Sequence, residues 1–367
     1  DAKVRLLALA NTQTVTFTYG SGGGASGATA PATLGSHTFT VKNRISDSSS
    51  SLTAISSSPT VDVVPAATKV LVGLTGQTVN GSSISGSCPT PAGGLTVTIA
   101  GTPTATTAGV AINSCVYATD NSDKFASLAT NNTSISSTPN DAQGTYPSAA
   151  NLVSGKGTFS ITFKTATNYA VTATPTSLTA GTSSSITINP DVTSKLVITT
   201  NPSSVNAGVE TTSYVVTRRD QYDNPTTSGT QTVNLTSDST GANKQFRDTA
   251  SGGGVTSVTI GAGVSTEDFF YYDEKSGSWN ISVAFSGLTG DSKALTVNPA
   301  AASNLVIISN PSSTTAGVET TAYVVRRQDQ YGNYVTSGTQ TVNLTSDSTG
   351  ANKQFRDTAS GGGVTSV

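Results

Sequence analysis

Two short turns contain the residues best placed to bind a ligand. The segment DQYDNP carries Asp220, Asp223 and Asn224, and the segment DQYGN carries Asp329 and Asn333. Carboxylate and amide oxygens suit Ca²⁺, which takes six to eight of them, and one such turn supplies only two or three. A linker or a neighbouring domain would have to supply the rest. Calcium is therefore a candidate cofactor, and the alternative is an Asx-type turn that satisfies its own backbone.

The two cysteines of the chain, Cys88 and Cys115, are a second candidate for chemistry. They do not form a C-x-x-C motif, and a zinc site does not fit them. We expect a disulfide, which would contribute about 3–4 kcal/mol by closing the loop between them. Two separately buried thiols are the alternative, and both states are compatible with an exported protein.

Groups suited to catalysis are few. His37, the only histidine, begins the run HTFTV with no G-x-S-x-G elbow nearby, so an exposed structural histidine is favoured. The glycine-rich runs at 20–27, 251–258 and 360–367 lack the following helix and the Lys-Ser/Thr pair of a phosphate loop. Carboxylates around an aromatic run could suggest glycosidase acids, although solvated rim charges are favoured: Glu267, Asp268, Asp273 and Glu274. We therefore expect no catalytic residues and no enzyme.

Two groups of residues are candidates for contact with sugars or for their attachment. Clustered aromatic residues could form a sugar-binding platform, but alternation along a strand turns half of them toward a core: Phe269, Phe270, Tyr271, Tyr272 and Trp279. Asn-x-Ser/Thr acceptors for glycosylation are present as well, and chance explains several of them in a chain so rich in Asn and Thr: Asn80, Asn131, Asn132, Asn234, Asn280 and Asn343.

An internal repeat organises the elements that must hold these residues. The segment that begins at Lys195 recurs from Asn304, 109 residues later, and residues 227–258 match 336–367 without a difference. A unit of this length is the size of one immunoglobulin-like sandwich. Strands that end in proline at Pro65, Pro190 and Pro299 extend the pattern to the rest of the chain.

These boundaries predict four segments. Residues 66–191 and 192–300 form complete domains, residues 1–65 match the second half of a unit, and residues 301–367 match the first half. A half sandwich leaves strand edges and an apolar face uncovered, so we expect the terminal halves to be completed by further chain or by another copy. Both routes predict an extended head-to-tail object. The unit 66–191 is longer because of a polar insertion at about 117–150, which we expect to be a surface loop.

Composition supports an all-β protein. Val, Ile and Thr recur in short alternating runs, which is typical of half-buried strands, and no window has helical periodicity. Charged residues make up 11% and the net charge is −2, so the chain lacks the basic face that nucleic acid requires. No apolar run approaches the length of a membrane helix.

The two turns carry a family resemblance. In DQYDNP and DQYGN, each between a β-run and a T-V-N-L-T strand, the sequence resembles bacterial Ig-like domains with their Asp-x-x-Gly-Asn-Pro turn, as in invasin- and intimin-type adhesins and surface-layer proteins. Asp223 replaces the Gly in one copy and Tyr334 replaces the Pro in the other. The resemblance implies tandem sandwiches and a spacer or lattice role at a cell surface.

The resulting hypothesis is a non-enzymatic structural protein. It would be extracellular, at the cell wall or in an S-layer, and would self-associate into a lattice, fibre or adhesin stalk. The alternative is a glycan-binding accessory array of a secreted polysaccharide-active enzyme. A cell-surface glycan is a candidate partner in both cases, and nucleic acid is not expected.

Overall fold

The computed structural model describes residues 34–38, 42–43, 53–54, 60–92 and 94–367. The glycine-rich run at 20–27 lies outside these residues. The described residues form β-strands and connecting turns, which confirms the all-β fold class. None of them belongs to a helix long and apolar enough to cross a membrane. The chain divides into two compact units, 1–192 with 220–226, and 193–219 with 227–367.

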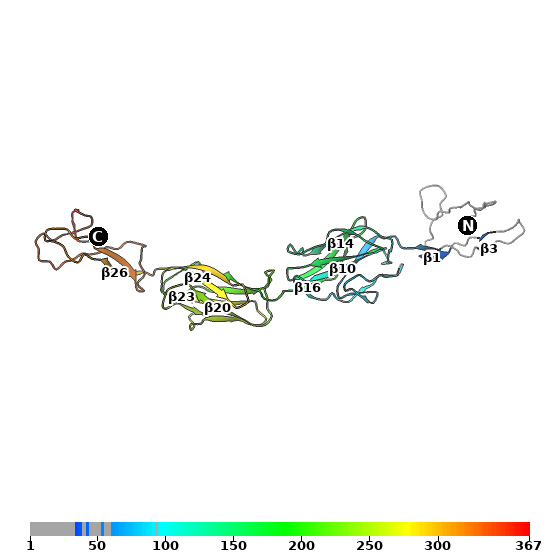
Figure 1. Ribbon diagram of the computed structural model, residues 1–367, viewed down its shortest axis with the longest axis horizontal. Coiled ribbons are helices and arrows are strands. Elements are labelled where there is room, and N and C mark those ends of the chain that lie inside the picture. The colour runs from blue at the N-terminus through cyan, green and yellow to red at the C-terminus, as the bar shows by residue number, and fades with distance from the viewer. Residues whose placement is uncertain (1–33, 39–41, 44–52, 55–59, 93) are drawn as a thin grey trace. The chain divides into compact units, whose positions relative to one another are not determined.

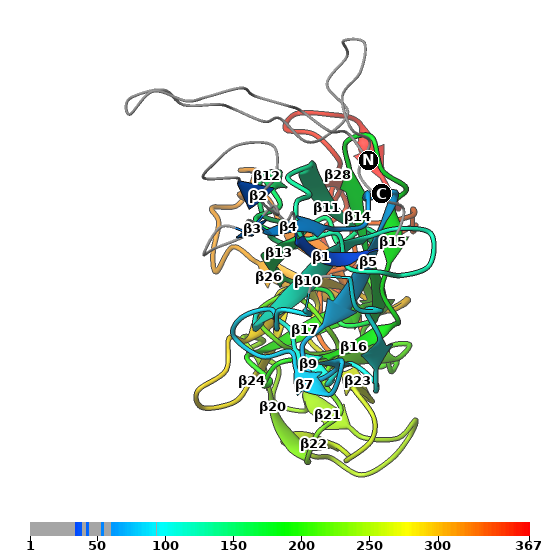
Figure 2. The ribbon, with the colours of Figure 1, turned by 90° about the vertical axis from the view of Figure 1, so that its right-hand side faces the viewer.

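Unit 1 contains a sandwich of two sheets. One sheet has the order β13-β10-β5, and the other has the order β12-β11-β14-β16-β9 with β15 beside β14; Figure 2 labels these strands in an end-on view. The strands of the first sheet are β5 (Lys69–Leu74), β10 (Ala111–Thr119) and β13 (Lys156–Thr162). Those of the second are β9 (Thr106–Thr107), β11 (Asn132–Thr138), β12 (Ala150–Asn151), β14 (Asn168–Pro175), β15 (Gly181–Thr182) and β16 (Ile186–Asn189).

Alternation along these strands builds the core between the sheets. In β14, residues Tyr169, Val171 and Ala173 are buried while the residues between them are not. They pack with apolar residues of β5, β10 and β13 in one cluster. Burial of apolar surface on this scale is the main force that holds two sheets face to face.

The expectation of a surface loop over 117–150 is wrong. Residues 132–138 form β11, which pairs with β14 and turns Thr133, Ile135 and Ser137 toward the core. Two of these three inward residues are hydroxylic, so a search for alternating apolar residues does not detect the strand. Burial of Thr and Ser is tolerated because their hydroxyls find backbone acceptors, as Thr133 does at the carbonyl of Asn131.

The extra length of this sandwich lies elsewhere. Between β5 and β9, the chain forms the small sheet β7-β6-β8, from β6 (Thr78–Val79), β7 (Ser82–Ser83) and β8 (Ile99–Ala100). This segment has its own apolar cluster, which includes Ile84, Val97 and both cysteines. In unit 2, β18 (Ser204–Asn206) corresponds to β9, because each pairs in parallel with the last strand of its sandwich, and it directly follows the first strand at Lys195–Thr200.

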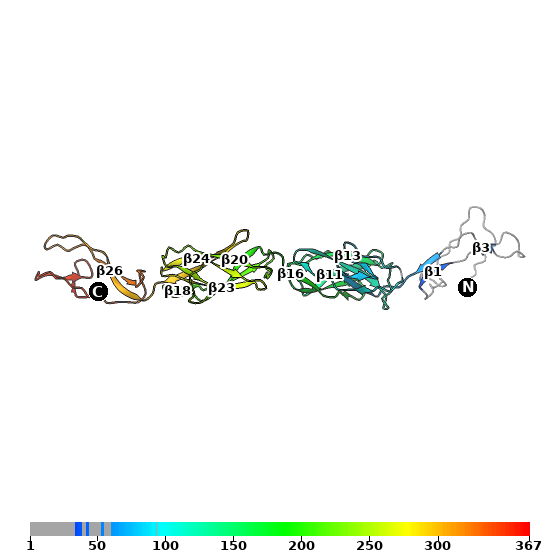
Figure 3. The ribbon, with the colours of Figure 1, turned by 90° about the horizontal axis from the view of Figure 1, so that it is seen from below.

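Unit 2 contains the second sandwich. Its sheets have the orders β17-β19-β23-β21 and β18-β25-β24-β20-β22, and β20 lies beside β24 in Figure 3. The strands are β17 (Lys195–Thr200), β18, β19 (Tyr214–Arg219), β20 (Gln231–Ser237), β21 (Gln245–Arg247), β22 (Ser257–Ile260), β23 (Thr266–Tyr272), β24 (Gly277–Ala284) and β25 (Asp291–Asn298). In both sandwiches a short strand pairs in parallel with the last strand, β9 with β16 and β18 with β25. The prediction of tandem immunoglobulin-like sandwiches is confirmed.

A buried arginine ties loops to the second sandwich. Arg218 on β19 is 1% exposed, and its guanidinium donates hydrogen bonds to the carbonyls of Ser228 (3.0 Å), Gly261 (3.0 Å) and Val264 (2.8 Å). Burial lowers the pKa of this side chain. Three carbonyl acceptors compensate for much of the cost of burying the charge, so Arg218 fixes the ends of two loops.

The remaining strands form pairs. In the third copy of the repeat, β26 (Ala302–Ser309) pairs with β27 (Val324–Asp329), and β28 (Phe355–Arg356) pairs with β29 (Gly363–Val364). Near the N-terminus, β1 (Gly35–Thr38) pairs with β4 (Thr60–Val63), and β2 (Lys42–Asn43) with β3 (Thr53–Ala54). Figure 1 shows each strand in chain order by colour.

The role of β11 in the core is testable. We expect Ile135→Ala to destabilise unit 1 by about 2–4 kcal/mol, because it removes buried methyl groups and leaves a cavity. Ser136→Ala is the matched control, since Ser136 is the exposed neighbour on the same strand. The measurement is amide exchange along β14 in increasing urea. Equal effects of the two substitutions would show that residues 132–138 lie outside the core.

Candidate functional site

The Asp–Asn turn of the second repeat is closed by one carboxylate. Asp220 is fully buried, and its Oδ1 accepts hydrogen bonds from the backbone N–H groups of Tyr222 (2.8 Å) and Asn224 (2.9 Å). Asp223 has a φ of 72°, in the left-handed region that Gly, Asn and Asp tolerate best. The turn is therefore an Asx-type turn built by its own side chain.

The turn of the third copy has the same geometry. Asp329 is buried, and its Oδ1 accepts hydrogen bonds from the N–H groups of Tyr331 (2.9 Å) and Asn333 (2.8 Å). Gly332 occupies the left-handed position with a φ of 81°. Asp in one copy and Gly in the other thus adopt the same left-handed backbone conformation.

The second oxygen of each carboxylate is occupied by further N–H groups. Asp220 Oδ2 accepts from the Asn224 side-chain amide (2.8 Å) and from the backbone of Asp191 (2.9 Å). Asp329 Oδ2 accepts from the Asn333 amide (2.9 Å) and from the backbone of Ala300 (2.9 Å). Each carboxylate therefore ties its turn to the linker that precedes the repeat.

These bonds set the protonation state of Asp329. Burial by itself raises the pKa of the carboxyl, but hydrogen bonds from Asn333, Ala300 and Tyr331 outweigh burial, and the net pKa lies below its usual range. The stability that the charged form contributes is present above the pKa of the unfolded chain. It is lost as the pH falls through the folded-state pKa.

The asparagine of each turn also reaches a loop at the end of the preceding sandwich. Asn224 donates to the carbonyl of Lys164 (2.7 Å) and accepts from the N–H of Ala166 (2.8 Å). Asn333 makes the same pair of bonds, with the carbonyl of Glu274 (2.7 Å) and the N–H of Ser276 (3.0 Å). Sequence reasoning did not identify these loops. Only backbone atoms of the loops are contacted, so residue type carries no signal for this contact.

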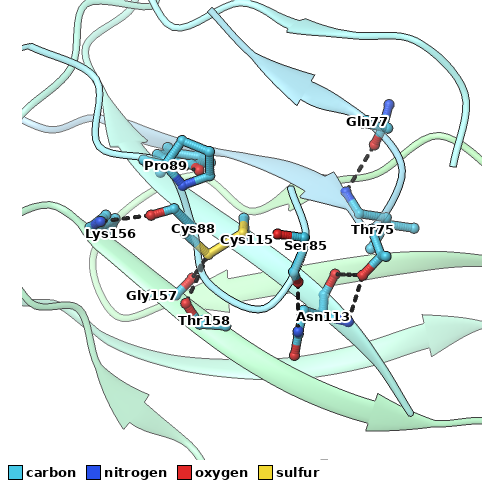
Figure 4. Close-up of a disulfide and its surroundings, with 12 residues drawn as sticks. Thr75, Gln77, Ser85, Cys88, Pro89, Asn113, Cys115, Lys156, Gly157 and Thr158 are labelled. Atoms are coloured by element: carbon cyan, nitrogen blue, oxygen red, sulfur yellow. Dashed lines mark hydrogen bonds between the residues drawn. A yellow bond between two sulfur atoms is a disulfide. The ribbon is translucent and has the colours of Figure 1, made fainter. Parts of the chain in front are cut away.

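The disulfide lies in the first sandwich. Cys88 and Cys115 are joined, with their Cα atoms 5.4 Å apart, and both are buried. Figure 4 shows the bond beside β13, where Lys156 Nζ donates to the carbonyl of Cys88 (2.8 Å) and Thr158 lies next to the sulfur. The bond connects the extra segment after β5 to the central strand β10. Closing a loop of this length stabilises the fold by about 3–4 kcal/mol.

The aromatic run lies mainly within the second sandwich. Phe269 and Tyr271 are fully buried, and Phe270, Tyr272 and Trp279 are half-buried. Trp279 packs against the core and donates its indole N–H to the carbonyl of Lys275 (3.0 Å). Arg247 covers the ring of Tyr272 at 5.2 Å from its centre.

The carboxylates near this run have structural contacts. Asp273 is buried and accepts hydrogen bonds from Tyr271 Oη (2.8 Å) and the N–H of Lys275 (2.9 Å). Glu274 accepts from Tyr272 Oη (2.8 Å) and Asn243 (2.6 Å). Glu267 and Asp268 adjoin on β23, where burial and then the charge of Asp268 raise the pKa of Glu267.

The other candidate residues are dispersed. His37 lies on β1 opposite Val61. Five glycosylation acceptors are exposed and Asn131 is half-buried, with exposure at Asn80, Asn132, Asn234, Asn280 and Asn343. Some of these side chains donate hydrogen bonds within the protein: Asn280 to Asp238 (2.8 Å) and Asn131 to the carbonyl of Thr176 (2.8 Å). Glycosylation at these positions stays a prediction.

No family model and no curated protein matches the chain. Among solved structures it is similar to FdeC, an Escherichia coli adhesin, at 19% identity over 68% of this chain and 79% of that chain, with a TM-score of 0.33. It is also similar to domains 4 and 5 of the S-layer protein SbsC, at 17% identity, 63% and 98% coverage, and a TM-score of 0.24. A glycosyl hydrolase family 2 member from Bacteroides cellulosilyticus matches at 9% identity over 52% of this chain but 23% of its own, with a TM-score of 0.26.

Calcium binding by the two turns stays a prediction and has a direct test. Among the described residues, no group of three or more His, Cys, Asp or Glu side chains is arranged to hold a metal ion. If calcium binds at Asp220, Asp223 and Asn224, or at Asp329 and Asn333, excess chelator lowers the melting temperature, because a ligand of the folded state stabilises it. If the melting curve is the same with and without chelator, the turns do not bind calcium and their role is hydrogen bonding alone.

Proposed function

We propose that the chain is a non-enzymatic structural module of an exported surface protein. The main observation behind the proposal is that the same turn, with the same hydrogen bonds, recurs in successive repeats. The same Asp–Asn turn occurs in two successive copies and makes the same bonds to its linker and to the sandwich before it. A spacer is built from repeated domains, and the same set of local contacts recurs here at each of the two turns.

The chemistry of the described residues supports a structural role. Two of the four carboxylates that resembled catalytic acids, Asp273 and Glu274, accept hydrogen bonds from donors of their own sandwich. The disulfide favours an oxidising compartment, and we propose an extracellular, cell-surface location on that ground. Within this role, a surface lattice, a fibre or an adhesin stalk are the finer forms that we propose, each formed by self-association.

A glycan-binding accessory array is the second candidate. The outward aromatic residues Phe270, Tyr272 and Trp279 motivate it, because sugar rings stack on exposed aromatic faces. In this sandwich those three side chains are half-buried, and Arg247 covers one of them. The structural role is therefore favoured.

The proposed role predicts surface exposure and assembly. An antibody against the chain should label intact cells of the source organism, and external protease should remove the label while a cytoplasmic protein stays intact. The purified chain should form ordered sheets or fibres, seen by electron microscopy and by a sedimenting fraction that grows with concentration. Label found only after cell lysis would contradict the location. A protein that stays monomeric and binds polysaccharides would contradict the structural role and support the accessory array.

A further inference from the structure

The tyrosine of each Asp–Asn turn makes a second contact with the preceding sandwich. The hydroxyl of Tyr331 lies directly against Gly208, so closely that a methyl group at Gly208 would overlap it. Tyr222 lies against Gly109 in the same way. Tyr331 also packs on the apolar core of the second sandwich, and Tyr222 on that of the first. Both glycines follow an alanine and precede a valine in the sequence.

The glycine and the loop bonded by the asparagine form one surface. Gly208 donates its N–H to the carbonyl of Asp273 (2.8 Å), next to the Glu274 carbonyl and the Ser276 N–H that hold Asn333. Gly109 donates to the carbonyl of Phe163 (2.7 Å), next to the groups of Lys164 and Ala166 that hold Asn224. We call the glycine with these two backbone groups the receptor, and the turn with its Tyr and Asn the docking turn.

The first sandwich offers a natural comparison. Its Asp120 turn has the same closure, because Asp120 Oδ1 accepts from the N–H groups of Ser122 (2.8 Å) and Lys124 (2.9 Å). Ser122 and Lys124 stand where the docking turns have Tyr and Asn. Lys124 reaches Thr96 of its own sandwich (3.0 Å). Closure of the turn by Oδ1 therefore does not require Tyr or Asn. In the docking turns the Tyr lies against the receptor glycine, and the Asn amide bonds both the receptor and Oδ2 of the turn's own Asp.

We infer that the Tyr–Asn pair is a docking element that couples a repeat to the sandwich that precedes it in the chain. Its partner is a receptor made of a glycine that adjoins the tyrosine and of one C=O and one N–H that the asparagine amide bridges. Because the receptor is mostly backbone, its sequence can vary while the coupling is kept. The docking of one repeat on the next is independent of whether the protein acts at a surface.

The duplicated sequence supplies a matched pair of variants. Gly208 and Gly317 occupy the same place in AGVETT, with φ of 78° and 79°, so an alanine meets the same backbone strain at both. Only Gly208 adjoins a docking tyrosine, whereas Gly317 has no atom within 4 Å of its added Cβ in the described part of the chain. In the 367-residue chain, we expect Gly208→Ala to raise amide exchange of Ser276 at least tenfold and Gly317→Ala to leave it unchanged.

A second pair of variants tests the asparagine. Asn333→Ala should raise exchange of Ser276 and leave Ala166 protected, and Asn224→Ala should have the reverse effect. In the Tyr331→Ala background, Gly208→Ala should destabilise the chain no more than Gly317→Ala does, because the overlap is gone. Equal exchange at Ser276 in the two glycine variants would overturn the docking inference. Protection of Ser276 that survives Asn333→Ala would overturn it as well.

Discussion

A buried carboxylate at the start of each turn is the interaction on which the joining of the repeats depends. Asp220 and Asp329 are shielded from water, so every oxygen lone pair must find a donor within the protein. Four N–H groups meet that demand in each copy, two from the turn, one from the linker and one from the asparagine. The carboxylate thereby shapes the turn, holds the linker and orients the amide that faces the preceding sandwich.

Much of the fold could be predicted from the sequence because alternation reports which residues face a core. It succeeded for strands such as β14 and β23, whose inward residues are apolar. It failed for β11, where Thr133 and Ser137 face inward and the apolar signal vanishes. The turns show another limit. A sequence shows that Asp and Asn oxygens lie close together, but it does not show whether N–H groups or a cation approach them.

The duplicated strands show which properties follow from the strand's own sequence and which depend on the neighbouring sheet. Leu196 and Ile198 on β17 are 1% and 3% exposed, while the matching Leu305 and Ile307 on β26 are 41% and 58% exposed. The two strands pair with equivalent partners, β19 and β27. These strands pair in the same way whether or not their side chains are buried, and burial depends on the facing sheet, which in the second sandwich includes β24 and β25. The docking contacts likewise could not be predicted from the sequence, because the receptor contributes mainly backbone atoms, which every residue has.

Asp329, held as an anion by its donors, keeps the docking turn in place. An NMR titration of the full chain from pH 7 downward tests it most directly, by following the Asp329 carboxyl carbon with the amides of Ala300, Asn333 and Ser276. The account predicts one shared midpoint below the ordinary aspartate pKa of about 3.9, with the Ser276 amide included although it does not touch Asp329. A midpoint at or above that value, or a Ser276 resonance that does not follow the carboxyl, would contradict it.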